Sequence, residues 1–341
     1  MANITPLSRV ETPRSQQMLE WLLTWSAFFA FVERRGGFEV AATDFDLFPT
    51  SGDGSVQTRG VGEGYTRQAE LPPDRVAKAL GFHGDSVVMD RSHLQDDRLG
   101  LRPIGSWVPP RLRSKFRDWV KGMEALVFQG AGTQAPREML GLSNLLDGST
   151  NVPGYSRTMV IDAADFSAAA TDSLDLSDSD QKEDFRKALE QILPNYENPG
   201  VICNRQLGSV ISGIAQEQTR YQREPDEIFG MIERVFGYEL VRVFDGVIPN
   251  TEPDNAGTPA NNTTSLYIAS PEEQRYSVAT NSGLWVKDEL DAEQVDEDDI
   301  ASGKIEWEMR CENAIQDEYA IVRVRNLKVA AGSEVYGFFG A

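Results

Sequence analysis

The chain has 341 residues, with 33 lysines and arginines against 53 aspartates and glutamates, so its net charge is −20. This balance argues against a protein whose main task is to bind nucleic acid or an anionic membrane surface, because both tasks need clustered cations. A hydrophobic content of 40% excludes a wholly disordered acidic chain, and two histidines exclude most imidazole chemistry. The two cysteines, Cys203 and Cys311, make neither a disulfide framework nor a thiolate metal site, and we expect both to be buried apolar residues.

The most apolar stretch, residues 18–32, lies near the N-terminus and is too short for a confident membrane span. Glu11 and Glu20, together with the absence of a small-residue cleavage site, argue against a secretion signal. We therefore predict one helix that buries its aromatic side chains against another element or another subunit and ends at Gly36 and Gly37. Because this helix is apolar nearly all round, it indicates an assembly.

Residues 36–75 predict a long extended excursion, in which short apolar segments flank a turn signal at 51–54 and a polar, glycine-rich stretch follows. We interpret it as a hairpin that projects from the body, with a free-standing flexible loop as the alternative. The sequence PPD at 72–74 predicts a short helix over 71–80, and residues 85–90 predict a brief strand.

The clearest helix begins near 106–110 and runs to about Phe128, because apolar residues recur there at three- and four-residue steps. From about residue 157, strands and helices alternate as in a compact α/β unit, with strands at 158–161, 200–203 and 238–244 and helices at 180–193 and about 207–214. Two alternating segments, 305–311 and 319–329, are predicted to pair as an antiparallel ribbon through residues 313–317.

No group of residues predicts a catalytic, cofactor-binding or metal site. The glycine-rich segments 60–64 and 130–132 lack the features of phosphate and dinucleotide loops, so we interpret them as backbone turns. The acidic run 288–299 (DELDAEQVDEDD) lacks the glycine and the ligand spacing of a calcium loop, which favours a solvated face or loop. The same interpretation applies to Asp172, Asp175, Asp178 and Asp180. Paired carboxylates for glycoside chemistry stay open, although abundant acidic residues make any single pair weak evidence.

Several segments resemble one protein family, in the same order along the chain. They are 59–64 (RGVGEG, with Gly62 where the family has asparagine), 80–91 (LGFHGDSVVMDR), 125–130 (ALVFQG) with 139–142 (MLGL), 184–189 (DFRKAL) and 200–205 (GVICNR). The family is that of the major capsid proteins of tailed bacteriophages, whose fold was first seen in the phage Hong Kong 97. The resemblance spans roughly residues 36–329 and depends on the order and spacing of the motifs together.

The resemblance implies an α+β fold of the Hong Kong 97 type. It would comprise an N-terminal arm (1–35), an E-loop hairpin that lies across the next subunit (36–70), a peripheral domain with a long spine helix (71–150), an α/β axial domain (151–280) and C-terminal strands of the peripheral domain (281–341). The chain would be a non-enzymatic major capsid protein that self-assembles through pentamers and hexamers into the icosahedral head of a virion, in the host cytoplasm.

The partners implied by the resemblance are other copies of the chain, with portal, scaffolding or decoration proteins. The packaged double-stranded DNA would be enclosed without specific binding, and neither a membrane nor a cofactor would take part. The negative charge agrees with this role, since a wall that adheres to DNA would hinder packaging.

Two departures from the family matter. The first lysine is Lys78, so the expected hairpin supplies none for the isopeptide cross-links of some relatives, and we expect no built-in scaffold from an N-terminal extension. Shell stability would then come from noncovalent burial. Two alternatives stay open: an encapsulin-type nanocompartment shell of the same fold, and a cytoplasmic hydrolase that uses carboxylates.

Overall fold

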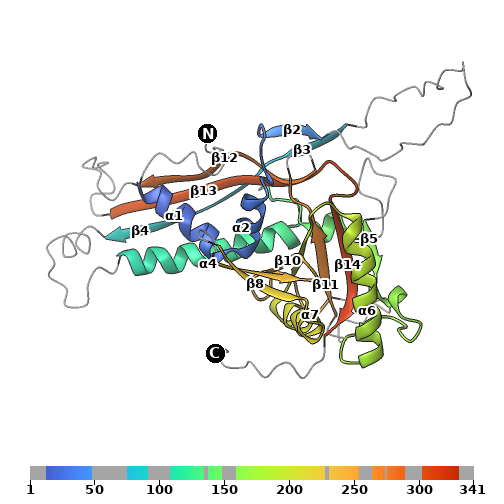
Figure 1. Ribbon diagram of the computed structural model, residues 1–341. Coiled ribbons are helices and arrows are strands. Elements are labelled where there is room, and N and C mark those ends of the chain that lie inside the picture. Colours follow the sequence, from blue (N-terminus) through green and yellow to red (C-terminus); the bar gives the residue numbers. More distant parts are fainter. Residues whose placement is uncertain are drawn as a thin grey trace, which may run out of the picture.

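The computed structural model describes residues 13–47, 75–90, 108–133, 137–147, 159–226, 230–252, 263–272, 275–288 and 302–329. Two sheets with helices packed on them form the body, and a short two-stranded pair lies beyond them (Figure 1). The helices are α1 (Pro13–Trp25), α2 (Ala27–Arg34), α4 (Val108–Gln129), α5 (Leu142–Leu145), α6 (Ser179–Ile192) and α7 (Arg205–Glu217), with 3-10 turns at Ala163–Phe166 and Leu193–Asn195.

The first sheet has four strands, in the spatial order β1 (Phe38–Val40), β12 (Tyr276–Asp288), β13 (Ser302–Ile315) and β4 (Gly81–Asp90). β1 runs parallel to β12, and the other pairs are antiparallel. Alternate residues of β13, among them Trp307 and Met309, are buried, because they face the helices α1 and α4 that pack on this side. The predicted alternation of this strand and the predicted long helix are therefore confirmed.

The second sheet has the order β5 (Val160–Asp162), β14 (Ile321–Lys328), β11 (Thr263–Ala269), β7 (Gly200–Cys203), β10 (Tyr238–Arg242), β9 (Gly230–Val235) and β8 (Tyr221–Asp226), with β6 (Leu174–Asp175) also paired to β14. Its central strands β7 and β11 are buried along their whole length, because helices lie on both faces. Helices α6 and α7 cover one face, and α2 packs against the other, where the Phe31 ring rests on Gly200. The alternating α/β unit predicted from residue 157 is confirmed.

Two main hydrophobic cores follow from this arrangement, and a small third cluster of Leu47, Leu80, Ala279 and Ala314 packs the β2–β3 pair onto the first sheet. The larger core fills the space between the first sheet, α1, α2 and α4 and continues onto the near face of the second sheet through Ile202, Val241 and Tyr267. The smaller core lies under α6 and α7 and takes the alternate residues of the same strands, such as Val201 and Cys203. The larger core joins the two sheets into one body.

The N-terminal apolar stretch forms two helices, so the prediction of a single helix was wrong. Ser26 separates α1 from α2 with extended backbone angles, and its hydroxyl accepts a hydrogen bond from the Phe29 amide at 3.0 Å as the N-cap of α2. The break lets the aromatic side chains of α2 turn toward the core of the same chain, where Phe28, Phe29 and Phe31 are fully buried. The chain then turns at Gly36, whose φ of +69° suits glycine.

Strands β2 (Asp44–Leu47) and β3 (Val76–Ala79) form the two-stranded pair, with Asp44 opposite Ala79 and Leu47 opposite Val76. This antiparallel pairing is the base that the predicted hairpin requires, and residues 48–74 lie outside the described part of the chain. The helix predicted over 71–80 was wrong for its described residues. The pairing with β2 holds residues 76–79 in a strand and overrides the helix-start signal in the preceding sequence.

The ribbon predicted from residues 305–311 and 319–329 was also wrong, because β13 and β14 lie in different sheets. β13 pairs with β12 and β4, whereas β14 pairs with β11, β5 and β6. The chain is redirected at residues 316–320, where the Gln316 amide donates to the Arg275 carbonyl at 2.6 Å and Arg275 Nε lies 3.2 Å from Asp317 Oδ2. As a result, segment 281–341 contributes to both sheets.

Candidate functional site

The acidic residues considered from the sequence stabilise turns and helix ends. Asp178 is the N-cap of α6 and accepts from the amides of Asp180 and Gln181 at 2.9 and 3.1 Å. Asp175 accepts from the Ser177 amide and lies 3.3 Å from Lys328 Nζ. Within the described ranges, no group of three or more histidine, cysteine, aspartate or glutamate side chains is placed to hold a metal ion.

The cysteines are buried as predicted, and burial raises the pKa of the Cys203 thiol to about 12. At 130–132 the chain forms an antiparallel bridge between Ala131 and Leu140 instead of the predicted turns, with Gly130 packed against the Met139 carbonyl and Gly132 at a φ of +67°. Segment 60–64, His93 and residues 289–299 of the acidic run lie outside the described ranges.

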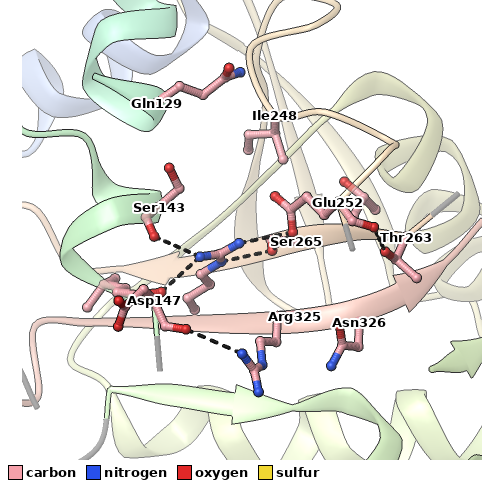
Figure 2. Close-up of polar contacts among 12 residues, drawn as sticks. Gln129, Ser143, Asp147, Ile248, Glu252, Thr263, Ser265, Arg325 and Asn326 are labelled. Atoms are coloured by element: carbon pink, nitrogen blue, oxygen red, sulfur yellow. Dashed lines mark hydrogen bonds and ion pairs between the residues drawn. The ribbon is translucent and has the colours of Figure 1, made fainter. Parts of the chain in front are cut away.

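A network of polar contacts connects α5 to the second sheet, and Figure 2 shows Ser143, Glu252 and Ser265 gathered in it. Its central residue is Arg323 of β14, whose side chain is only 11% exposed. Its Nη1 donates to the carbonyls of Ser143 and Leu146 at 2.9 Å each, at the C-terminal end of α5. Its Nε donates to Ser265 Oγ at 2.9 Å, and its Nη2 lies 3.0 Å from Glu252 Oε2. The guanidinium therefore connects α5, β11 and the Glu252 segment, because it is planar and donates several hydrogen bonds in fixed directions, which a lysine ammonium could not do.

A second polar contact lies inside the main core, at the break between α1 and α2. The Ser26 hydroxyl donates to one carboxyl oxygen of Glu124 on α4, and the Phe244 amide donates to the other at 3.0 Å. Burial raises the pKa of Glu124 to about 7, although the hydrogen bonds from Ser26, Phe244 and Phe28 lower it in part. This carboxyl links α2, α4 and the segment after β10.

A third polar contact holds the base of the β2–β3 pair. Lys78 Nζ on β3 lies 3.7 Å from Glu312 Oε1 on β13, and the Leu140 amide donates to the same carboxylate at 3.3 Å. Burial raises the pKa of Glu312 to about 7 against the attraction of Lys78, and it lowers the pKa of Lys78. Lys78 therefore lies at the base of the β2–β3 pair, beyond residues 36–70, and is engaged there in an ion pair.

The first sheet exposes apolar side chains on the face away from α4. Phe82 and Val88 of β4 and Trp285 of β12 are 41%, 52% and 48% exposed, and the Arg310 guanidinium covers the Phe82 ring at 4.7 Å. The ladder places Trp285 opposite Glu308, so charged residues of β13 separate these apolar side chains.

Sequence reasoning missed these polar contacts. Glu124 carried a usable signal, because it falls between Val120 and Val127 on the apolar face of the long helix, where a carboxylate needs buried donors. Arg323 and Glu252 carried none, since their partners come from four distant segments.

No described helix is long and apolar enough to cross a membrane. No protein-family model matches the sequence, and no curated protein is detectably similar to it. Solved structures are similar in fold. The holo-SrpI encapsulin complex from Synechococcus elongatus matches 86% of this chain and 85% of its own, with a TM-score of 0.51 and 11% identity.

Two capsid subunits are also similar. The capsid of an empty GTA particle covers 86% of this chain and 87% of its own at 16% identity and a TM-score of 0.48. The mature capsid of bacteriophage PhiM1 covers 86% of both chains at 12% identity and a TM-score of 0.48. The mixed α+β fold of the Hong Kong 97 type that the sequence resemblance implies is confirmed at the level of the fold by the likeness to the encapsulin.

Proposed function

We propose that this chain is a shell-forming structural protein that assembles through pentamers and hexamers into a closed icosahedral shell. The observation that carries the proposal is the β2–β3 pair, which lies outside both sheets and has 28 residues, 48–75, between its strands. A lone two-stranded hairpin is marginally stable in water, so a hairpin of this length needs a neighbouring surface. The exposed apolar side chains of the first sheet provide such a surface on an adjacent copy.

In this proposal the segments keep the roles implied by the family. Residues 36–70 act as the E-loop, α4 is the spine helix of a peripheral domain, residues 151–280 form the axial domain and residues 1–35 the N-terminal arm. Contacts between copies bury thousands of Å², on the order of 2,000 or more, as in obligate assemblies. The shell has no catalytic role.

The cargo we propose is a phage double-stranded DNA genome, enclosed without specific binding in a virion that assembles in the host cytoplasm. Portal and scaffolding or decoration proteins would complete the particle. The net charge of −20 supports this cargo, because an acidic wall repels packaged DNA and leaves it free to move.

The test is negative-stain electron microscopy of the purified full-length protein beside size-exclusion chromatography. Closed shells, tubes or rings of five or six subunits are expected. A homogeneous monomer that stays monomeric when it is expressed with the neighbouring structural genes of its operon would refute the proposal.

A second candidate is an encapsulin-type compartment, favoured by the likeness to the holo-SrpI encapsulin. The two candidates differ in their contents. Shells isolated from the native source and treated with nuclease are expected to retain double-stranded DNA of uniform length if the chain is a capsid protein. Shells that instead contain one folded enzyme in stoichiometric amount would establish the encapsulin.

A further inference from the structure

A cationic groove lies between α1 and the first half of α4. Its cavity, of about 650 Å³, is lined chiefly by Gln17, Trp21 and Trp25 of α1 and by Arg113, Ser114 and Arg117 of α4. On each helix, three residues follow one another at four-residue steps. On α1 they are residues 17, 21 and 25, and on α4 they are the cations Arg113, Arg117 and Lys121. Residues at such steps share one helix face, so the two rows run side by side.

The groove carries positive charge, and no described residue forms a salt bridge with its cations. The Arg113 guanidinium stacks over the rings of Trp21 and Trp25 at 5.9 and 5.6 Å, while Arg117 and Lys121 are exposed and have no partner among the described residues. Among the residues that the structure describes, no carboxylate lines the cavity. The first turn of α4 also has no acidic residue, and cations near a helix N-terminus are opposed by the helix dipole. Such a groove is expected to bind an anionic segment that also carries apolar side chains.

The position of α4 along the first sheet follows from Lys115. Its Nζ lies 2.9 Å from Asp85 Oδ1 and 2.5 Å from the Ser86 carbonyl on β4. Through the ladder, Ser86 is opposite Glu306 of β13, and Glu306 is opposite Lys287 of β12. Lys115 is thus level with the penultimate residue of β12, immediately before the acidic run.

α4 runs antiparallel to β4, because its C-terminal half meets the start of that strand, where Phe82 and Gln129 line one cavity. The N-terminal half of α4 therefore extends toward the end of the sheet at which β12 ends and β13 begins. Figure 1 shows α1, the start of α4 and the end of β12 gathered at this same end of the molecule.

The chain between β12 and β13 has the composition that the groove requires. Residues 288–299 hold five aspartates and three glutamates together with Leu290 and Val295. Thirteen residues separate Asp288 from Ser302, and at about 3.3 Å per residue they can reach roughly 20 Å out and back. That reach exceeds the helix diameter of about 10 Å. A tethered segment also has a much higher effective concentration at the groove than a free ligand.

We propose that the acidic segment 288–299 binds in the α1–α4 groove of its own chain, where its carboxylates neutralise Arg113, Arg117 and Lys121. The segment thereby keeps other polyanions, nucleic acid in particular, out of the groove. This inference does not depend on shell formation, because the contact lies within one chain and is measured directly.

Carbodiimide cross-linking tests the contact, since it joins an amine to a carboxylate only when the two are in contact. The reaction uses the full-length protein, mixed as unlabelled and ¹⁵N-labelled chains, with mass-spectrometric identification of the joined peptides. Lys121 is expected to couple to residues 288–299 within one isotopic species, and Arg117→Lys, which adds a second amine to the groove, is expected to couple likewise. Lys187 on α6 is the control and should not couple to this segment. About 1 M salt should suppress the product, because the Debye length falls to about 3 Å.

Absence of coupling from both amines, or products that join light with heavy chains, would overturn the proposal. Mixed products would assign the occupant to a neighbouring copy.

Binding of a 20-base-pair DNA duplex, followed by fluorescence anisotropy, tests the competition. Neutralising Asp296, Glu297, Asp298 and Asp299 to their amides should expose the groove and raise the affinity at least fivefold at 50 mM salt. Neutralising the exposed residues Asp172, Asp180, Glu217 and Asp245 changes the net charge equally and should not.

The gain should vanish when Arg113→Ala and Arg117→Ala are added. Three cations released by the segment should also give a salt slope of about −2.7 in log affinity against log salt. Equal gains from the two sets of neutralised residues would show a general charge effect and overturn the proposal.

Discussion

Removing the Arg323 guanidinium should destabilise the junction between α5 and the second sheet. The side chains of Arg323 and Glu252 are 11% and 10% exposed, so Arg323→Met leaves a buried carboxylate without its cation. It also leaves the carbonyls of Ser143 and Leu146 without the donor that now caps them. Removing one partner of a buried ion pair costs about 3–5 kcal/mol, and we expect a loss of unfolding free energy in this range.

The assay is urea unfolding followed by tryptophan fluorescence, with Lys182→Met as the matched control. Lys182 forms an ion pair of similar length with Glu217, at 3.0 Å, but Glu217 is 67% exposed. Exposed pairs contribute about 0–1 kcal/mol, so the control should change little. Arg323→Lys should be intermediate, because it keeps the charge and loses the planar fork.

The double variant Arg323→Met with Glu252→Leu discriminates between two explanations. If the cost arises from the unpaired carboxylate, removing that carboxylate should recover part of the loss, because a buried ion pair and an apolar pair of similar volume are close in energy. The reasoning is refuted if Arg323→Met costs no more than Lys182→Met, or if the double variant is as unstable as the sum of its two single variants.

Three further predictions follow from the close contacts and the buried carboxyls. Gly141→Ala should lower the free energy of unfolding by about 2 kcal/mol or more, because its Cβ would lie 2.4 Å from the Gly130 nitrogen. Gly122→Ala in α4 has open space around the new Cβ and should raise the free energy of unfolding by about 0.5–1 kcal/mol. Equal effects of the two variants in urea unfolding would contradict this. The folded state holds the Glu124 proton more tightly than the unfolded state does. The contribution of this carboxyl to the free energy of unfolding therefore decreases as the pH rises from 4.5 to 7. As the pH rises through that window, the free energy of unfolding of Glu124→Gln should increase relative to that of the wild type, by at most about 3 kcal/mol. A difference between the two proteins that stays constant with pH would refute the raised pKa of Glu124. Replacing residues 50–72 with a short glycine turn should preserve the circular dichroism of the subunit and abolish closed shells in electron micrographs, and normal particles from this variant would show that the hairpin is not needed between subunits.

The elements that the sequence predicted correctly are those with an unbroken local pattern. The apolar spacing of α4 extends over 22 residues, and the strand–helix alternation around β7 and α7 repeats clear start signals, including Asn204 as an N-cap. In both cases the contacts that fix the element follow from neighbours in the chain.

The errors occurred where distant segments decide the structure. Ser26 looks like one polar residue in an apolar helix, yet it caps α2 and donates to Glu124, 98 residues away. The alternation of apolar residues in β13 and β14 does not indicate which strands they pair with. A local ribbon and two separate sheets are therefore equally consistent with the sequence pattern. The Arg323 contacts could not be predicted from the sequence for the same reason.

The pairing of β1 with β12 has a consequence for the biosynthesis of the chain. Phe38 lies opposite Val278, and Val160 lies opposite Arg323, so the first sheet is complete only after Ile315 has been synthesised and the second only after Lys328. Until then, the aromatic side chains of α2 lack the first sheet they pack against, and such exposed surface calls for chaperones. Contacts this distant in sequence also form slowly. The fold is therefore completed only after nearly all of the described part of the chain has been synthesised, so early segments wait for strands that come almost 300 residues later.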